Sequence, residues 1–142
     1  MKILLFSFCF FILALGRGHT AEARIQEMTD AINQIRSQAG LGQLYWDDAL
    51  MTAAFVHSRG MAELGYCNHG GLYERVYTYG WRGYGIGEIV SCGADNHWTA
   101  IYRWLNSPGH RQNLLNGYYN HVGISHYYGR AGHRWTVIFG RR

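Results

Sequence analysis

Two histidines and one carboxylate, His69, His110 and Glu88, are the residue types that most plainly could carry chemistry in this chain. Two neutral imidazoles and a carboxylate suit Zn²⁺, with water in the open coordination position. Such a water could be activated for hydrolysis with Glu88 as general base. However, the order His, Glu, His lacks the close spacing of a helical zinc-protease motif. On the residues alone, three unrelated polar positions are the favoured interpretation.

His57 and Ser107 are secondary candidates. Ser107 and His110 could pair as nucleophile and base, but Ser107 directly precedes Pro108, a position typical of a helix cap. The sequence also lacks a Gly-x-Ser-x-Gly nucleophile motif. His57 falls in the apolar stripe of a predicted helix, which favours a core histidine with hydrogen-bonded ring nitrogens over a wall residue of a binding site.

The N-terminal segment is typical of a secretory signal peptide. A basic start precedes an almost unbroken apolar run over residues 3–15, and a small-residue cleavage pattern ends at Ala23. The run is shorter than the roughly 20 apolar residues that a membrane-spanning helix needs. We therefore predict a signal peptide over residues 1–23 and one domain over residues 24–142. We expect a secreted protein, extracellular or periplasmic, with no stable membrane anchor after cleavage.

Cys67 and Cys92 are the two cysteines that remain after the signal peptide. In an exported chain, two cysteines most simply form one disulfide, and the alternative is a pair of free buried thiols. Closing a loop of this length would stabilise the fold by roughly 3 kcal/mol in the chain-entropy picture.

The positive charges of the chain are spread along it. The formal net charge is +4, but the arginines form no basic run. A nucleic-acid-binding surface would cluster them, so we expect no nucleic acid partner.

Helical periodicity comes first along the chain and strand periodicity last. Apolar residues three and four apart predict two long helices, over about 25–39 and between Asp47 and Gly65, and shorter helical segments follow. Gly60 inside the second helix costs about 1 kcal/mol, which predicts that something packs closely there. Alternating residues predict a late β-hairpin with a loop of about four residues over 129–132. This order predicts an α+β fold.

Several segments, taken together, resemble the CAP family of cysteine-rich secretory, antigen five and pathogenesis-related proteins, also called the SCP domain. They follow the family's order over nearly all of residues 24–142, and they are Leu44-Tyr45-Trp46-Asp47, Cys67-Asn68-His69, Gly87-Glu88, the run from Trp104 to Leu115, Val122-Gly123-Ile124 and Phe139-Gly140.

The resemblance implies an α-β-α sandwich with a central antiparallel sheet, and a cleft lined by two histidines and two acidic residues. By this resemblance His69 is the first histidine, Glu88 the first acid and His110 the second histidine. The second acid has no counterpart, because Asn106 and Ser107 stand in its neighbourhood.

Two functions are compatible with this resemblance, and the first is a secreted binding or interaction module without turnover. Its His/Glu cleft would hold a divalent cation such as Zn²⁺, or a lipid- or sterol-like ligand. The partner would be an extracellular lipid, sterol, glycan or protein. The alternative is a metal-dependent hydrolase of an extracellular polymer, peptide or ester. The missing second acid and the missing nucleophile motif favour the binding module.

Overall fold

A computed structural model describes residues 20–142 of the chain. The predicted signal peptide lies almost wholly outside the described residues, and its expected cleavage after Ala23 falls in the first helical turn, where it stays a prediction. The elements in chain order are α1 (Ala21–Gln38), β1 (Tyr45–Trp46), α2 (Asp48–Leu64), α3 (Leu72–Thr78), β2 (Tyr84–Cys92), α4 (His97–Leu105), α5 (Pro108–Leu114), β3 (His121–Gly129) and β4 (Gly132–Arg141).

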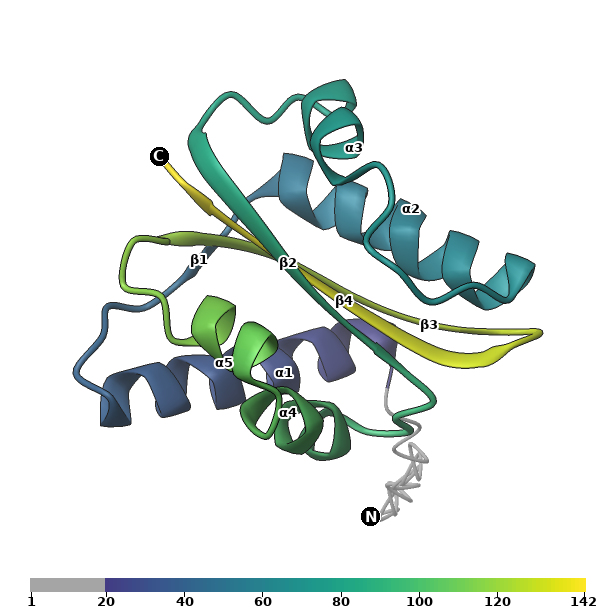
Figure 1. Ribbon diagram of the computed structural model, residues 1–142, viewed down its shortest axis with the longest axis horizontal. Coiled ribbons are helices and arrows are strands. Elements are labelled where there is room, and N and C mark those ends of the chain that lie inside the picture. Colours follow the sequence, from purple (N-terminus) through teal and green to yellow (C-terminus); the bar gives the residue numbers. More distant parts are fainter. Residues whose placement is uncertain (1–19) are drawn as a thin grey trace, which may run out of the picture.

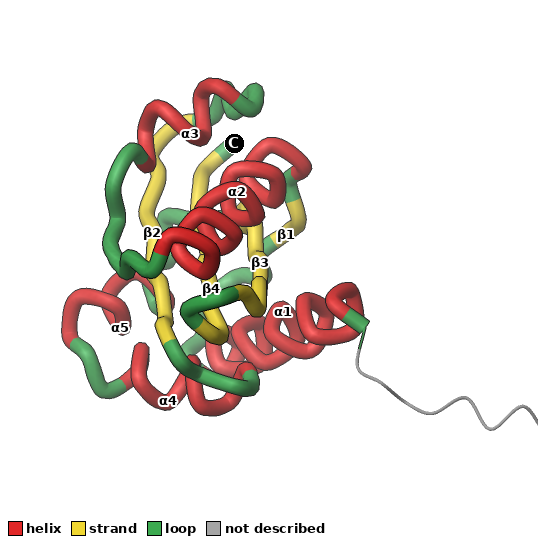
Figure 2. Tube along the Cα trace, turned by 90° about the vertical axis from the view of Figure 1, so that its right-hand side faces the viewer, coloured by secondary structure: helices red, strands yellow, loops and turns green. Residues whose placement is uncertain are grey.

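Helices cover both faces of one sheet whose strand order is β1-β3-β4-β2. In Figures 1 and 2, α2 and α3 lie on the upper side of this sheet, and α1, α4 and α5 lie on the lower side. This confirms the predicted α-β-α sandwich. β2, β3 and β4 pair antiparallel as expected, whereas the two-residue β1 joins β3 in parallel.

Alternate residues of the central strand β4 point into the two halves of the core. Val137 and Phe139 pack with the apolar residues of α1, α4 and α5, and Ile138 packs with those of α2 and α3. Glu88 of β2 is the registered partner of Ile138, so its side chain points to the same face. Glu88 therefore faces α2 and α3.

Helix α2 begins and ends as its sequence predicts. Asp47 accepts hydrogen bonds from the amides of Ala49 and Leu50 at 3.0 and 3.1 Å, and Gly65 ends the helix with φ at 80°. The predicted close contact at Gly60 is also confirmed. A Cβ on this residue would lie 2.4 Å from the hydroxyl of Tyr66. The tyrosine that follows the helix thus folds back onto it.

The β3–β4 hairpin is tighter than its sequence predicted. Gly129 pairs with Gly132, so the connection has two residues rather than about four. The residues near the hairpin tip are half-exposed, so the apolar alternation ends before them. Their backbones still pair, and the strands therefore extend beyond the alternating pattern. Gly132 has a φ of 85°, a conformation that favours glycine and permits the short turn.

Candidate functional site

Glu88 is at the centre of the candidate site, and its side chain is only 1% exposed. Its Oε1 lies 3.0 Å from Nδ1 of His69, which donates a hydrogen bond to it. Its Oε2 accepts a hydrogen bond from Nη2 of Arg75. Both carboxylate oxygens are therefore engaged by other side chains of the chain.

Glu88, His69 and Arg75 form a cluster of side chains, and the imidazole of His57 also belongs to it. Its Nε2 donates to the backbone carbonyl of Asn68 at 2.7 Å and lies 3.7 Å from Oε1 of Glu88. Burial lowers the pKa of His57, and the charge of Glu88 opposes that shift only in part. The ring is thus a hydrogen-bonded core histidine, as its sequence position favoured, and it also borders the cluster.

His110 reaches the cluster from the opposite layer of the fold. It belongs to α5, below the sheet, and its ring centroid lies 6.1 Å from that of His69. The contact exists because β2 is an edge strand, so side chains from both layers meet beyond its open edge. Burial, followed by the charge of His69, lowers the pKa of His110, which favours the neutral ring near neutral pH.

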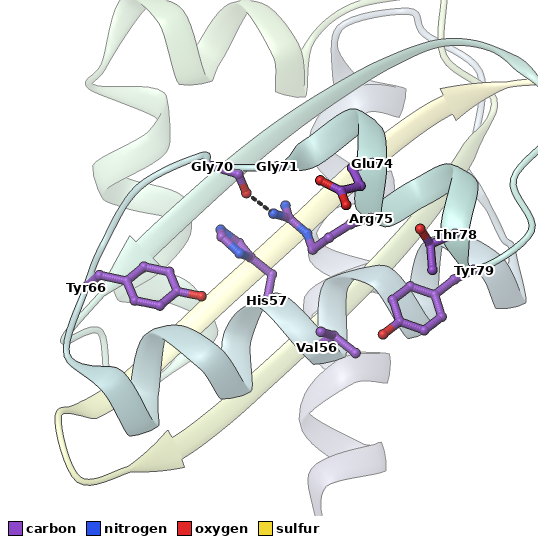
Figure 3. A pocket seen from close by; sticks show the side chains of 9 residues that line it. All are labelled: Val56, His57, Tyr66, Gly70, Gly71, Glu74, Arg75, Thr78 and Tyr79. Atoms are coloured by element: carbon purple, nitrogen blue, oxygen red, sulfur yellow. Dashed lines mark hydrogen bonds between the residues drawn. The ribbon is translucent and has the colours of Figure 1, made fainter.

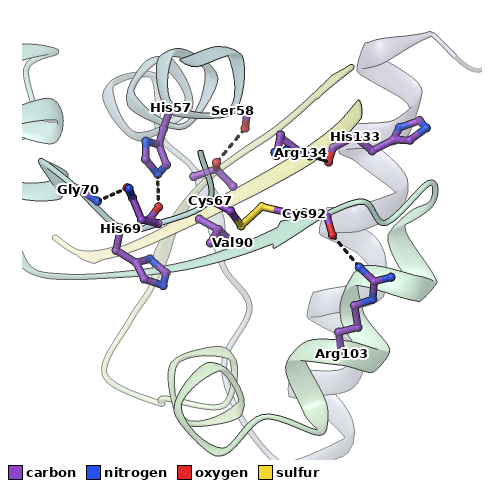
Figure 4. Close-up of a disulfide and its surroundings, with 12 residues drawn as sticks. His57, Ser58, Cys67, His69, Gly70, Val90, Cys92, Arg103, His133 and Arg134 are labelled. Carbon is purple, nitrogen blue, oxygen red and sulfur yellow. Dashed lines mark hydrogen bonds between the residues drawn. A yellow bond between two sulfur atoms is a disulfide. The ribbon is translucent and has the colours of Figure 1, made fainter. Parts of the chain in front are cut away.

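The predicted disulfide between Cys67 and Cys92 is confirmed, with Cα atoms 6.4 Å apart. Figure 4 shows it joining the loop that carries His69 to the end of β2. Cys67 lies two residues before His69, and Cys92 lies four residues after Glu88. The bond therefore restrains the two segments that bring the histidine and the carboxylate together.

Arg75 is the site residue that the sequence analysis missed. Its side chain is 12% exposed, and it donates to the Gly70 carbonyl as well as to Glu88. An arginine beside Glu74 in a short helix is typical of a solvated face. The signal that could have found it is the spacing of Leu72, Arg75 and Val76, which places the arginine on the inner stripe of α3.

Ser107 occupies the N-cap position of α5, as predicted, but its hydroxyl makes no capping hydrogen bond. Within residues 20–142 no hydrogen bond joins it to His110. The nucleophile and base pair considered from the sequence is therefore not assembled in this arrangement.

The histidines and Glu88 do not form a three-ligand metal site in this arrangement. Nowhere in residues 20–142 are three His, Cys, Asp or Glu side chains placed so that they could hold one metal ion. Glu88 directs its oxygens at Arg75 and His69 instead. Of the predicted set, only the two neighbouring rings of His69 and His110 remain as ligands that could face a metal together.

A cavity of about 300 Å³ lies next to the cluster, between α2 and α3. It shares His57 and Arg75 with the cluster and does not include His69 or His110. Figure 3 shows its lining, which consists of Val56, His57, Tyr66, Gly70, Gly71, Glu74, Arg75, Thr78 and Tyr79. The cavity therefore borders the Glu88 cluster through His57 and Arg75.

Comparison with known proteins places this architecture in a family. The model of the cysteine-rich secretory protein family, CAP, matches residues 29–139. The uncharacterised membrane protein YlbC of Bacillus subtilis (strain 168) is 36% identical over 110 residues, which are 74% of this chain and 31% of that protein. The protein YkwD of the same strain is 29% identical over 123 residues, 83% of this chain and 46% of that protein. This chain therefore spans less than half the length of either relative.

Solved structures give the same result. An extracellular protein with an SCP domain from Bacillus anthracis str. Ames superimposes with a TM-score of 0.80 at 30% identity, over 86% of this chain and 41% of that one. An outer surface protein of Borrelia burgdorferi also gives 0.80, at 23% identity, over 87% and 96%. No helix within residues 20–142 has the length and apolar character needed to cross a membrane. With its sandwich fold, its disulfide and a family match over most of its length, the chain belongs to the CAP family.

Proposed function

We propose that this protein acts outside the cell as a binding module without turnover. The similar solved structures include an extracellular and an outer surface protein, which supports the location. The proposed lack of turnover rests on one observation, namely that Arg75 and His69 each donate a hydrogen bond to a different oxygen of the Glu88 carboxylate. A carboxylate with both oxygens paired is poorly suited to take a proton from water or to bind a metal.

Freeing Glu88 for chemistry would be costly. Its side chain is 1% exposed, so a rearrangement would leave a charge without its partner inside the protein. Removing one partner of a buried ion pair typically costs about 3–5 kcal/mol. Substrate binding would have to supply that free energy before any hydrolysis, which disfavours the hydrolase alternative.

In this proposal Zn²⁺ or another divalent cation is not needed for ligand binding. His69 and His110 are the two neighbouring rings that could share an ion, and solvent would complete its coordination. With two protein ligands, we expect weak binding. Ligand capture by the module does not depend on the ion.

The cavity between α2 and α3 is the proposed place for the ligand. Its volume of about 300 Å³ is at the lower end of the range for small-molecule sites. Arg75, Glu74 and the tyrosine hydroxyls supply hydrogen-bonding groups. Among extracellular lipids, sterols, glycans and proteins, these features favour a small polar group of a glycan or a protein.

The test combines zinc titration with hydrolysis assays on the disulfide-intact protein after signal-peptide removal. Nitrophenyl esters and casein serve as substrates, and His69→Ala/His110→Ala is compared with His121→Ala, which removes a histidine outside the cluster. We expect no turnover in any form and, at most, weak zinc binding that only the double variant loses. Hydrolysis that needs zinc together with His69 and His110 would overturn the proposal.

A further inference from the structure

A bulge near the start of β2 brings a tyrosine next to an arginine of β4. The start of β2 and the end of β4 lie side by side at one end of the sheet (Figure 1). Ile86 is opposite Gly140 and Tyr84 is opposite Arg141, so Gly85 is an extra residue on β2. Gly85 has a φ of 53°, which is typical of a glycine in a β-bulge. Because the extra residue interrupts the alternation of side chains, Tyr84 lies on the same face of the sheet as Arg141.

Tyr118 lies against the same bulge, in the segment that follows α5. A Cβ on Gly85 would lie 2.7 Å from Cε1 of Tyr118, so the missing side chain leaves room for this ring. The Arg141 guanidinium lies over the ring, 5.7 Å from its centroid, and its Nη1 donates to the Tyr118 carbonyl at 3.2 Å. Tyr84, Tyr118 and Arg141 are therefore neighbours, and we call these three residues the tyrosine–arginine platform.

The platform is open to solvent. Tyr84 is 74% exposed and Tyr118 is 49% exposed, and Arg141 is exposed as well. Apart from the bond to the Tyr118 carbonyl, no hydrogen bond or ion pair within residues 20–142 engages the N–H donors of Arg141. Aromatic side chains contribute mainly through the area that they bury, and these two rings bury little of it in the fold. Exposed tyrosines beside an arginine are typical of a binding surface.

The chemistry of the platform suits a sugar that carries a carboxylate. The C–H face of a sugar ring is apolar and can lie on a tyrosine ring, while its hydroxyls stay hydrated at the rim. An arginine binds a carboxylate through two parallel N–H bonds. A protein partner would instead need an apolar centre in the interface. Within residues 20–142 the exposed large aliphatic side chains, Val56 and Leu64, belong to α2 and not to this surface.

We infer that the tyrosine–arginine platform binds an extracellular glycan chain that carries carboxylate groups. One sugar ring lies on Tyr84, and a carboxylate of the chain pairs with Arg141 beside Tyr118. None of these three residues lines the cavity between α2 and α3, so the platform is a second ligand surface that goes beyond the proposed function. An open surface suits a polymer that passes over it, whereas single small molecules are usually bound in cavities.

Calorimetric titration with three short probes tests the class of ligand. Tetragalacturonate combines sugar rings with carboxylates, chitotetraose is a neutral tetrasaccharide, and a glutamate tetramer has carboxylates without sugar rings. We expect tetragalacturonate to bind saturably, with an affinity that falls as the salt concentration rises. We expect the other two probes to bind at least about threefold more weakly, because each lacks one of the two contacts.

Two variants locate the binding, and each has a matched control. Tyr84→Ala removes the exposed ring, and its control is Tyr102→Ala on α4, where the tyrosine is 70% exposed. Arg141→Gln removes the charge, and its control is Arg130→Gln in the exposed hairpin loop. We expect Tyr84→Ala to weaken tetragalacturonate binding at least about fivefold and Arg141→Gln about threefold, with both controls unchanged.

The inference is overturned if tetragalacturonate does not bind at about 1 mM, the range of weak complexes. It is also overturned if either other probe binds as tightly, or if Tyr84→Ala or Arg141→Gln leaves the affinity unchanged. Equal binding of the glutamate tetramer would indicate an acidic peptide partner instead.

Val56→Trp, which fills the cavity between α2 and α3, separates this inference from the proposed function. We expect it to leave tetragalacturonate binding unchanged. If Val56→Trp abolishes that binding and Tyr84→Ala does not, the glycan is bound in the cavity, so the binding module stands and the platform is wrong. Hydrolytic turnover in the assays described above would overturn the binding module without changing the affinities measured here.

Discussion

Arg75 and Glu88 form an ion pair that joins α3 to the edge strand β2 beneath the protein surface. The carboxylate is 1% exposed and the arginine side chain 12% exposed. His69 uses the second oxygen of the same carboxylate, so one buried anion organises the loop, the helix and the strand around it. The free energy of this arrangement is measurable by breaking the pair from either side.

We predict strong coupling between these two residues. Arg75→Met leaves Glu88 buried without its cation and should lower the free energy of unfolding by about 3–5 kcal/mol. Glu88→Gln in that background removes the stranded charge, so the double variant should lose clearly less than the sum of the single losses. Urea unfolding of the four proteins gives the coupling energy. Arg59→Met, on the exposed side of α2, should change stability little. Additive losses would contradict the buried pair.

The disulfide should contribute measurably to stability. Cys67 and Cys92 are 25 residues apart in sequence, and the chain-entropy model gives about 3 kcal/mol for a loop of this size. We expect reduction, or Cys67→Ser/Cys92→Ser, to lower the melting temperature, and reductant to have no further effect on the double variant. A melting temperature that is the same with and without reductant in the wild-type protein would argue that the bond restrains nothing.

The features that could be predicted from sequence are those with local signals. The Asp47 cap, the Gly65 stop and the two cysteines each act through their immediate chemistry, and all three were confirmed. The placement of Glu88 with His69 needed the family resemblance, because residues 19 apart in sequence carry no spacing rule that brings them together.

The partners of Arg36 and Arg75 could not be predicted from the sequence. Arg36 is fully buried and donates to four backbone carbonyls, those of Gly42, Leu114, Asn116 and Tyr119. Three of these acceptors are about 80 residues away, at the end of α5 and in the segment after it, whose path only the folded chain defines. The helical spacing of α3 places Arg75 on the inner stripe, but it does not identify the partners Gly70 and Glu88. An arginine is normally solvated, so its burial depends on partners that sequence periodicity does not show.

Gly123 should tolerate no side chain. A Cβ at this position of β3 would lie 2.0 Å from the carbonyl carbon of Leu50, a backbone atom of α2 that cannot move alone. Gly123→Ala would force the helix off the sheet, so we expect a loss of at least roughly 3 kcal/mol, at the upper end of overpacking effects. Gly42→Ala is the matched control, because nothing lies within 4 Å of its Cβ position. Chemical denaturation compares the two, and equal stabilities would rule out the close approach of α2.

His126 should make the protein lose stability as the pH falls from about 6.5 to about 4. Burial, then the charge of the neighbouring His133, and then that of Arg24, lowers the pKa of His126 from 6.5 to about 4. Its Nε2 lies 2.9 Å from Nδ1 of His133. Above pH 6.5 both the folded and the unfolded chain hold the ring neutral, and the stabilisation is fully present. Below that pH the unfolded chain takes up a proton that the folded chain resists, so folding is progressively disfavoured.

The loss from His126 should reach at most roughly 3 kcal/mol by pH 4, since each pKa unit corresponds to about 1.4 kcal/mol. His57 and His110 have lowered pKa values too and add to the same slope, so the comparison must be between variants. Urea unfolding at several pH values should show a shallower slope for His126→Gln than for the wild-type protein. His121→Gln, on the same strand, controls for the loss of a histidine. If the wild-type and His126→Gln slopes coincide, His126 is not the group that resists protonation in the fold.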